Sequence, residues 1–181
     1  MNLYAIPNLA VSVYTLILGL VVIRANPRAK VNRLCFLLTS VSFVWLFGYG
    51  IMYLNNDYDK ALRIAKIGHA AAVILVPTVY WFMLAALGAY SKKFDHYLAI
   101  ISIVVALVAS MMTYLSKSYF VDISKHYWGY YPIGGPYMLL HTAWTFFIAI
   151  RAIFLLRDAS GRAAKELQYE NYLKFKYYAY L

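Results

Sequence analysis

The sequence predicts an all-α, polytopic integral membrane protein: a helical bundle of five full transmembrane helices and the start of a sixth. Hydrophobic residues make up 64% of the chain and charged residues 13%, which is far from the composition of a soluble domain. The apolar residues also gather in five stretches of about 20 residues, the length at which a helix crosses a hydrocarbon layer of about 30 Å. No water is present there to satisfy backbone groups, so each stretch must be helical.

The five predicted spans are residues 4–23, 34–54, 70–90, 97–116 and 136–156. The second begins beside Cys35, the only cysteine, so an intrachain disulfide is excluded. The third contains Pro77. Because a proline removes a backbone hydrogen bond and clashes with the preceding turn, we expect a kink there that opens space beside the outer half of the fifth span. The fifth begins at Pro136, which suits a first helical turn.

Residues 1–156 thus form the predicted bundle, and residues 157–181 form a second region. This region starts as a polar, basic segment at Arg157 and regains apolar character from Tyr169. Such a return is typical of the opening turns of a further helix. We therefore expect a cytoplasmic basic segment followed by the beginning of a sixth helix.

The distribution of basic residues predicts the orientation. The first connection, residues 24–33, holds four basic residues and no acidic residue, so the positive-inside rule assigns it to the cytoplasm and the N-terminus to the outside. Alternation of the spans then gives eleven basic residues inside and five outside. The inner ones are Arg24, Arg28, Lys30, Arg33, Lys92, Lys93, Arg157, Arg162, Lys165, Lys174 and Lys176, and the outer ones are Lys60, Arg63, Lys66, Lys117 and Lys125.

The net charge of +10 does not indicate a nucleic-acid partner, because most basic residues lie in short connections between apolar spans. No catalytic motif is present, and no Cys/His spacing indicates a metal site. We therefore expect neither an enzyme activity, nor a metal, nor a cofactor in this chain. All seven acidic residues are assigned to connections or to the C-terminal segment, which weakens the hypothesis of an ion-coupled transporter.

The longest connection, residues 117–135, carries six aromatic side chains and admits two interpretations. It could be a belt of aromatic residues at the membrane interface, which such side chains commonly form. It could instead be a lid over an outward-facing pocket. The sequence favours the belt without excluding the lid.

Two ionisable side chains lie in the fifth span, where helical spacing puts His141, Trp144 and Arg151 on one face. A charge facing lipid is costly, so this face is expected to point into the bundle. Arg151 could also extend toward the cytoplasmic headgroups. His141 could make an interhelical hydrogen bond, or it could form a ligand site or pH-sensing site with His69, which starts the third span at the same level.

Three segments carry a resemblance to a known family. They are residues 26–38 running into 43–50, residues 61–70 followed by 76–82, and residues 134–141. They provide a basic first connection, an aromatic second helix, a third helix with a central proline, and a Gly-Pro-aromatic-His opening of the fifth helix. This order resembles the N-terminal seven-transmembrane (7TM) region of bacterial sensor histidine kinases, which is also found on diguanylate cyclases.

The resemblance implies a sensory, signal-input function in the bacterial inner membrane, with lipid and possible membrane subunits or a second copy as partners. We expect a small-molecule input site between His69, Trp81, His141 and Trp144, with Pro77 and Arg151 acting in helix packing or signal coupling. The output would pass through the fifth helix. Two alternatives stay open: a non-catalytic accessory subunit of a larger membrane complex, and, with less support, a transporter fragment.

Overall fold

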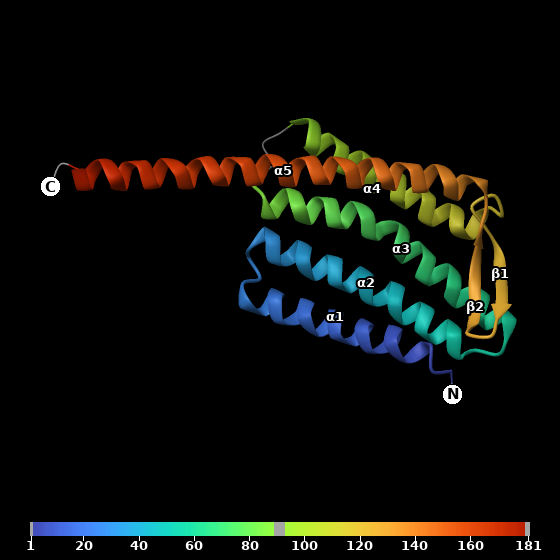
Figure 1. Ribbon diagram of the computed structural model, residues 1–181. Helices are drawn as coiled ribbons and strands as arrows, with labels where there is room; N and C mark the ends of the chain where they lie inside the picture. The colour runs from blue at the N-terminus through green and yellow to red at the C-terminus, as the bar shows by residue number, and fades with distance from the viewer. Residues whose placement is uncertain (1, 89–92, 180–181) are drawn as a thin grey trace.

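The computed structural model describes residues 2–88 and 93–179, and Figure 1 shows their arrangement. The helices are α1 (Ala5–Ala25), α2 (Lys30–Leu54), α3 (Tyr58–Ala86), α4 (Lys93–Leu115) and α5 (Pro136–Ala179), and a hairpin of β1 (Phe120–His126) and β2 (Gly129–Gly134) precedes α5. All five helices contain a segment long and apolar enough to cross a membrane. The protein is therefore a mostly helical membrane protein with five candidate spans, as the sequence predicts.

The helices pack in chain order, with α1 on α2, α2 on α3, and α3 on both α4 and α5 (Figure 1). Small residues allow the closest contacts. A Cβ atom on Gly48 of α2 would lie 3.2 Å from the Cα atom of Gly68 of α3. Such backbone proximity is a common way for helices to associate in lipid, where no hydrophobic effect drives them together.

The third helix begins at a side-chain cap and ends at a glycine. The Asp57 carboxylate caps the N-terminus of α3 by accepting a hydrogen bond from the Lys60 backbone N–H. Beyond the end of α3, Gly88 has a φ of +62°, a conformation that favours glycine. The helix continues through Pro77 and changes direction in its middle part (Figure 1). A proline inside a helix is expected to cause such a bend.

Most of the connection between α4 and α5 is an antiparallel β-hairpin, in which Ile123 pairs with Pro132 and Lys125 with Tyr130. Its turn ends at Gly129, whose φ is +124°. Inward-facing side chains of the hairpin (Phe120, Ile123 and Tyr130) join a buried cluster with the outer ends of α2 and α3. Aromatic and β-branched side chains, which this connection contains, favour strands. The sequence pattern does not show that the two segments pair with each other.

The final helix is longer than the sequence indicates. Residues expected to begin a sixth helix instead continue α5 as far as Ala179, and residues 180–181 lie outside the described part of the chain. The segment after Arg157 contains strong helix formers and no proline, so nothing in it stops the helix. Its 44 residues give a length of about 66 Å, so α5 projects well beyond the bundle (Figure 1).

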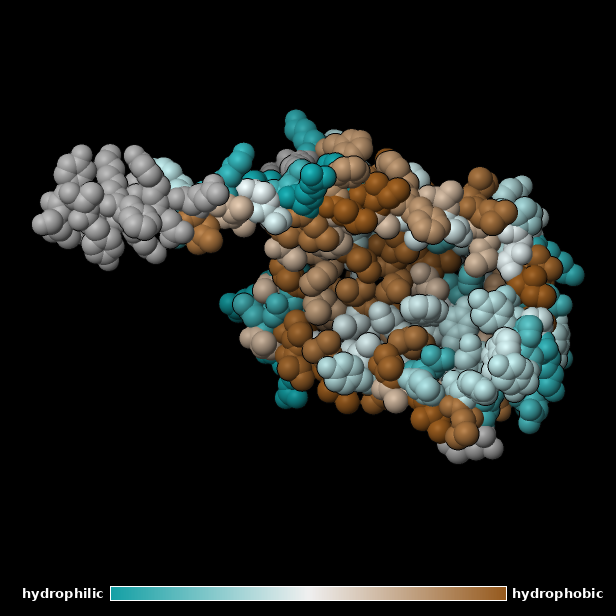
Figure 2. Space-filling model, viewed as in Figure 1, coloured by the Kyte–Doolittle hydropathy of each residue, from teal (hydrophilic) through white to brown (hydrophobic). Residues whose placement is uncertain are grey.

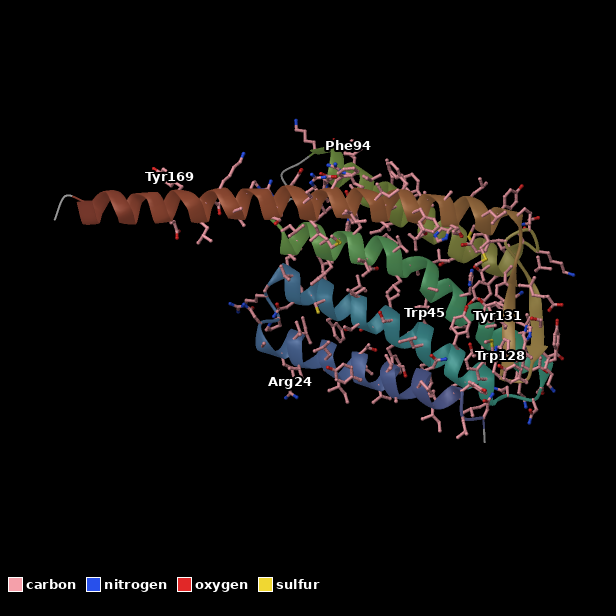
Figure 3. The ribbon with its side chains drawn as sticks, viewed as in Figure 1. Arg24, Trp45, Phe94, Trp128, Tyr131 and Tyr169 are labelled. Carbon is pink, nitrogen blue, oxygen red and sulfur yellow. The ribbon has the colours of Figure 1, made fainter. Side chains whose placement is uncertain are left out.

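The bundle has two polar ends and an apolar middle (Figure 2). Trp128 and Tyr131 mark the hairpin end, whereas Arg24 and Phe94 lie toward the opposite end (Figure 3). Tyr169 lies on the projecting part of α5, which leaves the bundle at the Arg24 end (Figure 3). The same end therefore contains the basic first connection and the start of the projection.

Candidate functional site

The halves of α4 and α5 nearest the hairpin, which the predicted orientation puts on the outer side, are separated by a cavity of about 430 Å³. Its walls come from Val104, Val108 and Met112 of α4 and from Leu140, His141 and Trp144 of α5, with Tyr119 just before the hairpin. This volume is typical of a small-molecule site, and the walls are almost entirely apolar. The space lies beside the outer half of α5, as the sequence predicts, but α4 bounds it and Pro77 of α3 does not line it.

Tyr119 connects the two histidines that the sequence singles out. The centroid of its ring lies 5.8 Å from that of His69 and 6.1 Å from that of His141. His141 lines the cavity, whereas His69 is only 6% exposed and lies behind Tyr119. The histidines therefore occupy one neighbourhood, but only His141 is at the cavity wall.

Polar atoms around the cavity lack partners. Within the described residues, no hydrogen bond is made by His69 Nε2, by the Tyr119 hydroxyl or by Trp144 Nε1, although all three atoms are buried. A buried polar group without a partner costs about 1–3 kcal/mol of stability, so such groups commonly mark a site for a ligand or for water. Three of them in one region distinguish this cavity from an ordinary gap between helices.

The two tryptophans expected at the site lie in different surroundings. Trp144 lines the cavity and also packs against a second buried cluster at the inner halves of α3, α4 and α5. Trp81 packs against this inner cluster and is not part of the cavity wall. Thus the structure brings His141 and Trp144 to the cavity, sets His69 one layer behind it, and leaves Trp81 toward the inner half.

An ion pair connects α4 with α5 at the inner end of the bundle. Arg151 donates from Nε to Asp95 Oδ1 at 2.7 Å and from a terminal nitrogen to Asp95 Oδ2 at 2.9 Å. The Tyr80 hydroxyl of α3 also donates to Asp95 Oδ1, at 2.7 Å. Asp95 is completely buried and Arg151 is 27% exposed, so three helices meet at one carboxylate.

The sequence interpretation missed this carboxylate. Asp95 was expected in a connection, but it lies in the first turn of α4, where the positive end of the helix dipole favours a negative charge. Arg151 turns toward it and its guanidinium lies 5.5 Å from the centroid of the Phe94 ring, instead of extending to the headgroups. The sequence signal that could have found this pair is that Asp95 and Arg151 lie near the same side of two predicted spans, where two opposite charges can pair.

The hairpin end has a second, more polar hollow of about 500 Å³. Asn2, Tyr53, Asn56, Lys125 and Tyr127 are among its lining residues. The Asn2 side-chain amide donates to the backbone carbonyls of Tyr53 (2.9 Å) and Trp128 (2.6 Å), which ties the N-terminal segment to the hairpin turn. Among the described residues, no group of three or more His, Cys, Asp or Glu side chains could hold a metal ion.

A hydrogen bond to a carboxylate also connects β1 with α3. The Tyr58 hydroxyl donates a hydrogen bond to the Asp122 carboxylate, and this bond, together with the Ile123 backbone N–H, holds the pKa of Asp122 below its usual range. The carboxylate therefore stays ionised at neutral pH. It fixes the hairpin over the outer end of α3.

Five apolar helices, a cavity between two of them and a helix that leaves the bundle define a polytopic helical membrane protein. Residues 8–173 match the family described as the N-terminal 7TM region of histidine kinase, so the chain belongs to that family. Comparison with curated proteins and with solved structures gives no match.

Proposed function

We propose that this chain is the sensory input region of a histidine-kinase-type receptor and performs no chemistry itself. Its family supports this function, since that family is the membrane region of such kinases. The input site is the cavity between α4 and α5, with His141 and Trp144 in its wall and His69 behind Tyr119. The hairpin that precedes α5 acts as a lid at the outer end.

The observation that carries the proposal is the continuity of α5. Its outer half forms one wall of the cavity, and the same helix extends without interruption to Ala179. Residues 157–179 add about 34 Å beyond the spanning part. A rigid helix transmits rotation or displacement along its length, so a change at the cavity reaches the projecting end.

The Asp95–Arg151 pair holds α5 in its resting position. It is a two-pronged contact between a carboxylate and a guanidinium, which fixes orientation as well as distance. Because Arg151 lies between the cavity wall and the projection, the pair acts as a pivot. Outward movement at Leu140 or His141 becomes movement of the opposite sense beyond Arg157.

The receptor lies in the bacterial cytoplasmic membrane with its N-terminus outside. The eleven-to-five excess of basic residues on the inner side supports this orientation. The hairpin and the mixed-polarity hollow then face the outside, and the projecting part of α5 faces the cytoplasm. Trp128 and Tyr131 lie at the hairpin end of the bundle (Figure 3), and in this orientation that end meets the outer interface, so the hairpin would act as both belt and lid.

The proposal can be tested by rotating the output domain around the axis of α5 with inserted residues. Residues 1–181 would be joined, as a continuous helix, to the dimerisation and catalytic domains of a histidine kinase, and alanines would be inserted one at a time after Ser160. One or two inserted residues turn the output domain around the helix axis and are expected to change autophosphorylation strongly. Seven inserted residues, about two full turns, are expected to restore it.

Two outcomes contradict the proposal. If autophosphorylation does not depend on the number of inserted residues, α5 does not transmit its orientation to the output domain. Loss of a larger assembly in the Leu140→Ala or His141→Ala variant, with autophosphorylation unchanged, would favour the accessory-subunit alternative, in which partner helices cover the same faces.

A further inference from the structure

The cavity between α4 and α5 opens toward the lipid rather than toward water alone. Val104 and Val108 line it on α4 and are 54% and 53% exposed. Leu140 lines it on α5 and is also strongly exposed. These side chains belong to candidate spans, so the exposed edge of the cavity lies at the depth of the hydrocarbon chains. A molecule dissolved in the bilayer can therefore enter from the side.

The cavity presents two kinds of surface to a ligand, one apolar and one able to donate hydrogen bonds. The wall is apolar and suits a hydrocarbon chain. The same wall also contains two buried donors without partners among the described residues, the Tyr119 hydroxyl and Trp144 Nε1. An oxygen acceptor attached to the chain would satisfy either donor. A pure hydrocarbon would leave both unsatisfied.

A basic residue lies in the chain two positions before Tyr119, close to the junction of the hairpin with α5. Tyr137 lines the cavity, and its backbone N–H donates to the Ser118 carbonyl at 3.0 Å, next to Lys117 in the chain. Lys117 is exposed at the end of α4. A carboxylate that does not reach Tyr119 would meet this ammonium group at the interface. The Tyr119 hydroxyl and the Lys117 charge thus lie toward the hairpin end of the cavity.

We infer that the ligand of this site is a single-chain amphiphile from the bilayer, a long-chain fatty acid or a molecule of the same build. This inference rests on the proposed sensory function and names its ligand class. The chain lies between Val108 and Leu140, and the head lies near Tyr119 and Lys117. The Tyr119 hydroxyl is buried, so an acceptor that reaches it must displace neighbouring atoms. Because the Tyr119 ring packs against His141 of α5, this displacement is expected to move that part of α5.

A helix from a second copy or from another subunit is the competing occupant. A helix satisfies its own backbone groups and offers side chains of many kinds, but it would have to place an acceptor at two separate buried donors. The cavity volume of about 430 Å³ also suits a small molecule. These two features favour the amphiphile.

Quenching of Trp144 fluorescence by bromine atoms tests the inference. The full chain, with Trp45, Trp81 and Trp128 replaced by Phe, would be placed in phosphatidylcholine nanodiscs. Brominated stearic acid would be added and compared with brominated phosphatidylcholine. Saturable quenching by the acid at a low mole fraction is expected. Quenching that rises linearly and equally with both probes would show contact with bulk lipid only and would overturn the inference.

Three variants locate the site. Val108→Phe fills the cavity and is expected to weaken stearate binding at least tenfold, whereas Val11→Phe, at a similarly exposed valine of α1, is expected to leave it unchanged. Tyr119→Phe removes only the hydroxyl and should weaken stearate about three- to tenfold, with no effect on a brominated alkane. Equal binding in Val108→Phe and the unmodified chain would contradict the site.

If the tryptophan variants fail to fold, photo-crosslinking of the unmodified chain provides a second test of the ligand site. A stearate carrying a diazirine would be activated in nanodiscs with the unmodified chain, and labelled residues would be mapped by mass spectrometry. Labels concentrated in residues 104–112 and 137–144 are expected. Labels spread over α1 and α2, or crosslinks between two copies through α4 and α5, would overturn the ligand class. Failure of these tests would leave the insertion assay unaffected, so the two claims can fail separately.

Discussion

Replacing Arg151 by methionine tests whether the inner ion pair is a desolvated contact that holds α5. The substitution keeps an unbranched apolar stem but removes both donors to Asp95. Asp95 is completely buried, and it would retain the Tyr80 hydroxyl as a donor. Removing one partner of a buried ion pair is strongly destabilising, so we expect a loss of about 3–5 kcal/mol in the free energy of unfolding.

Two further variants separate the contribution of the Tyr80 hydrogen bond to stability from that of the ion pair. Tyr80→Phe removes one hydrogen bond to a charged group and should cost about 1.5–3 kcal/mol. The double variant Asp95→Leu with Arg151→Met removes both charges, and it should be more stable than Arg151→Met alone, because no buried charge is left without its partner. The cycle formed by Arg151→Met, Asp95→Leu and the double variant is therefore expected to give a favourable coupling energy between the two charges.

The assay is reversible unfolding in mixed micelles with increasing denaturing detergent, followed by circular dichroism. Arg157→Met is the matched control, because it removes the next basic residue of α5, which is exposed. A loss in Arg151→Met no larger than about 0.6 kcal/mol, the average for an interhelical hydrogen bond in a membrane protein, would refute the reasoning. It would mean that Arg151 is solvated at the headgroups.

The junction between hairpin and α5 and the orientation of the chain give two further predictions. A Cβ atom on Gly135 would lie 2.2 Å from the Ser118 carbonyl oxygen, so Gly135→Ala should lower stability by about 1–3 kcal/mol in the same unfolding assay. Gly161 has nothing within 4 Å of such an atom, so Gly161→Ala should instead raise stability by up to about 1 kcal/mol, and the opposite order would contradict the packing described here. For orientation, cysteines at Asn56 and Ser160, in a chain without its native cysteine, would be treated with an impermeant thiol reagent on intact cells. We expect labelling at Asn56 only, and labelling at Ser160 alone would invert the topology.

Hydropathy predicts the spans well because the bilayer imposes one simple requirement, a helix of sufficient apolar length. The five spans are recovered within a few residues at most ends, and α3 starts earlier, at Tyr58, as an amphipathic extension. The hairpin was not predicted. Its pairing joins residues such as Ile123 and Pro132 through geometry between strands, which no periodicity of a single segment reveals.

The candidate site was predictable only in part, for a related reason. Helical spacing puts His141 and Trp144 on one face, and both line the cavity. Trp81 and His69 lie on α3, and their relation to α5 depends on how the helices pack in three dimensions. The burial of Asp95 was missed because a charged residue at the edge of an apolar stretch reads as part of a connection. Its neighbours Arg151 and Tyr80, which lie on other helices, help to make its burial tolerable.

The central claim is that the position of α5 in the membrane sets the position of its projecting end. Spin labels on exposed positions at Arg33 of α2 and Ser160 of α5, in a Cys35→Ser chain in nanodiscs, would report the distance between the bundle and the projection. We predict that Arg151→Met shifts or broadens this distance distribution and that the Arg157→Met control does not. An unchanged distribution in Arg151→Met would contradict the claim that the ion pair of α4 and α5 holds the output helix.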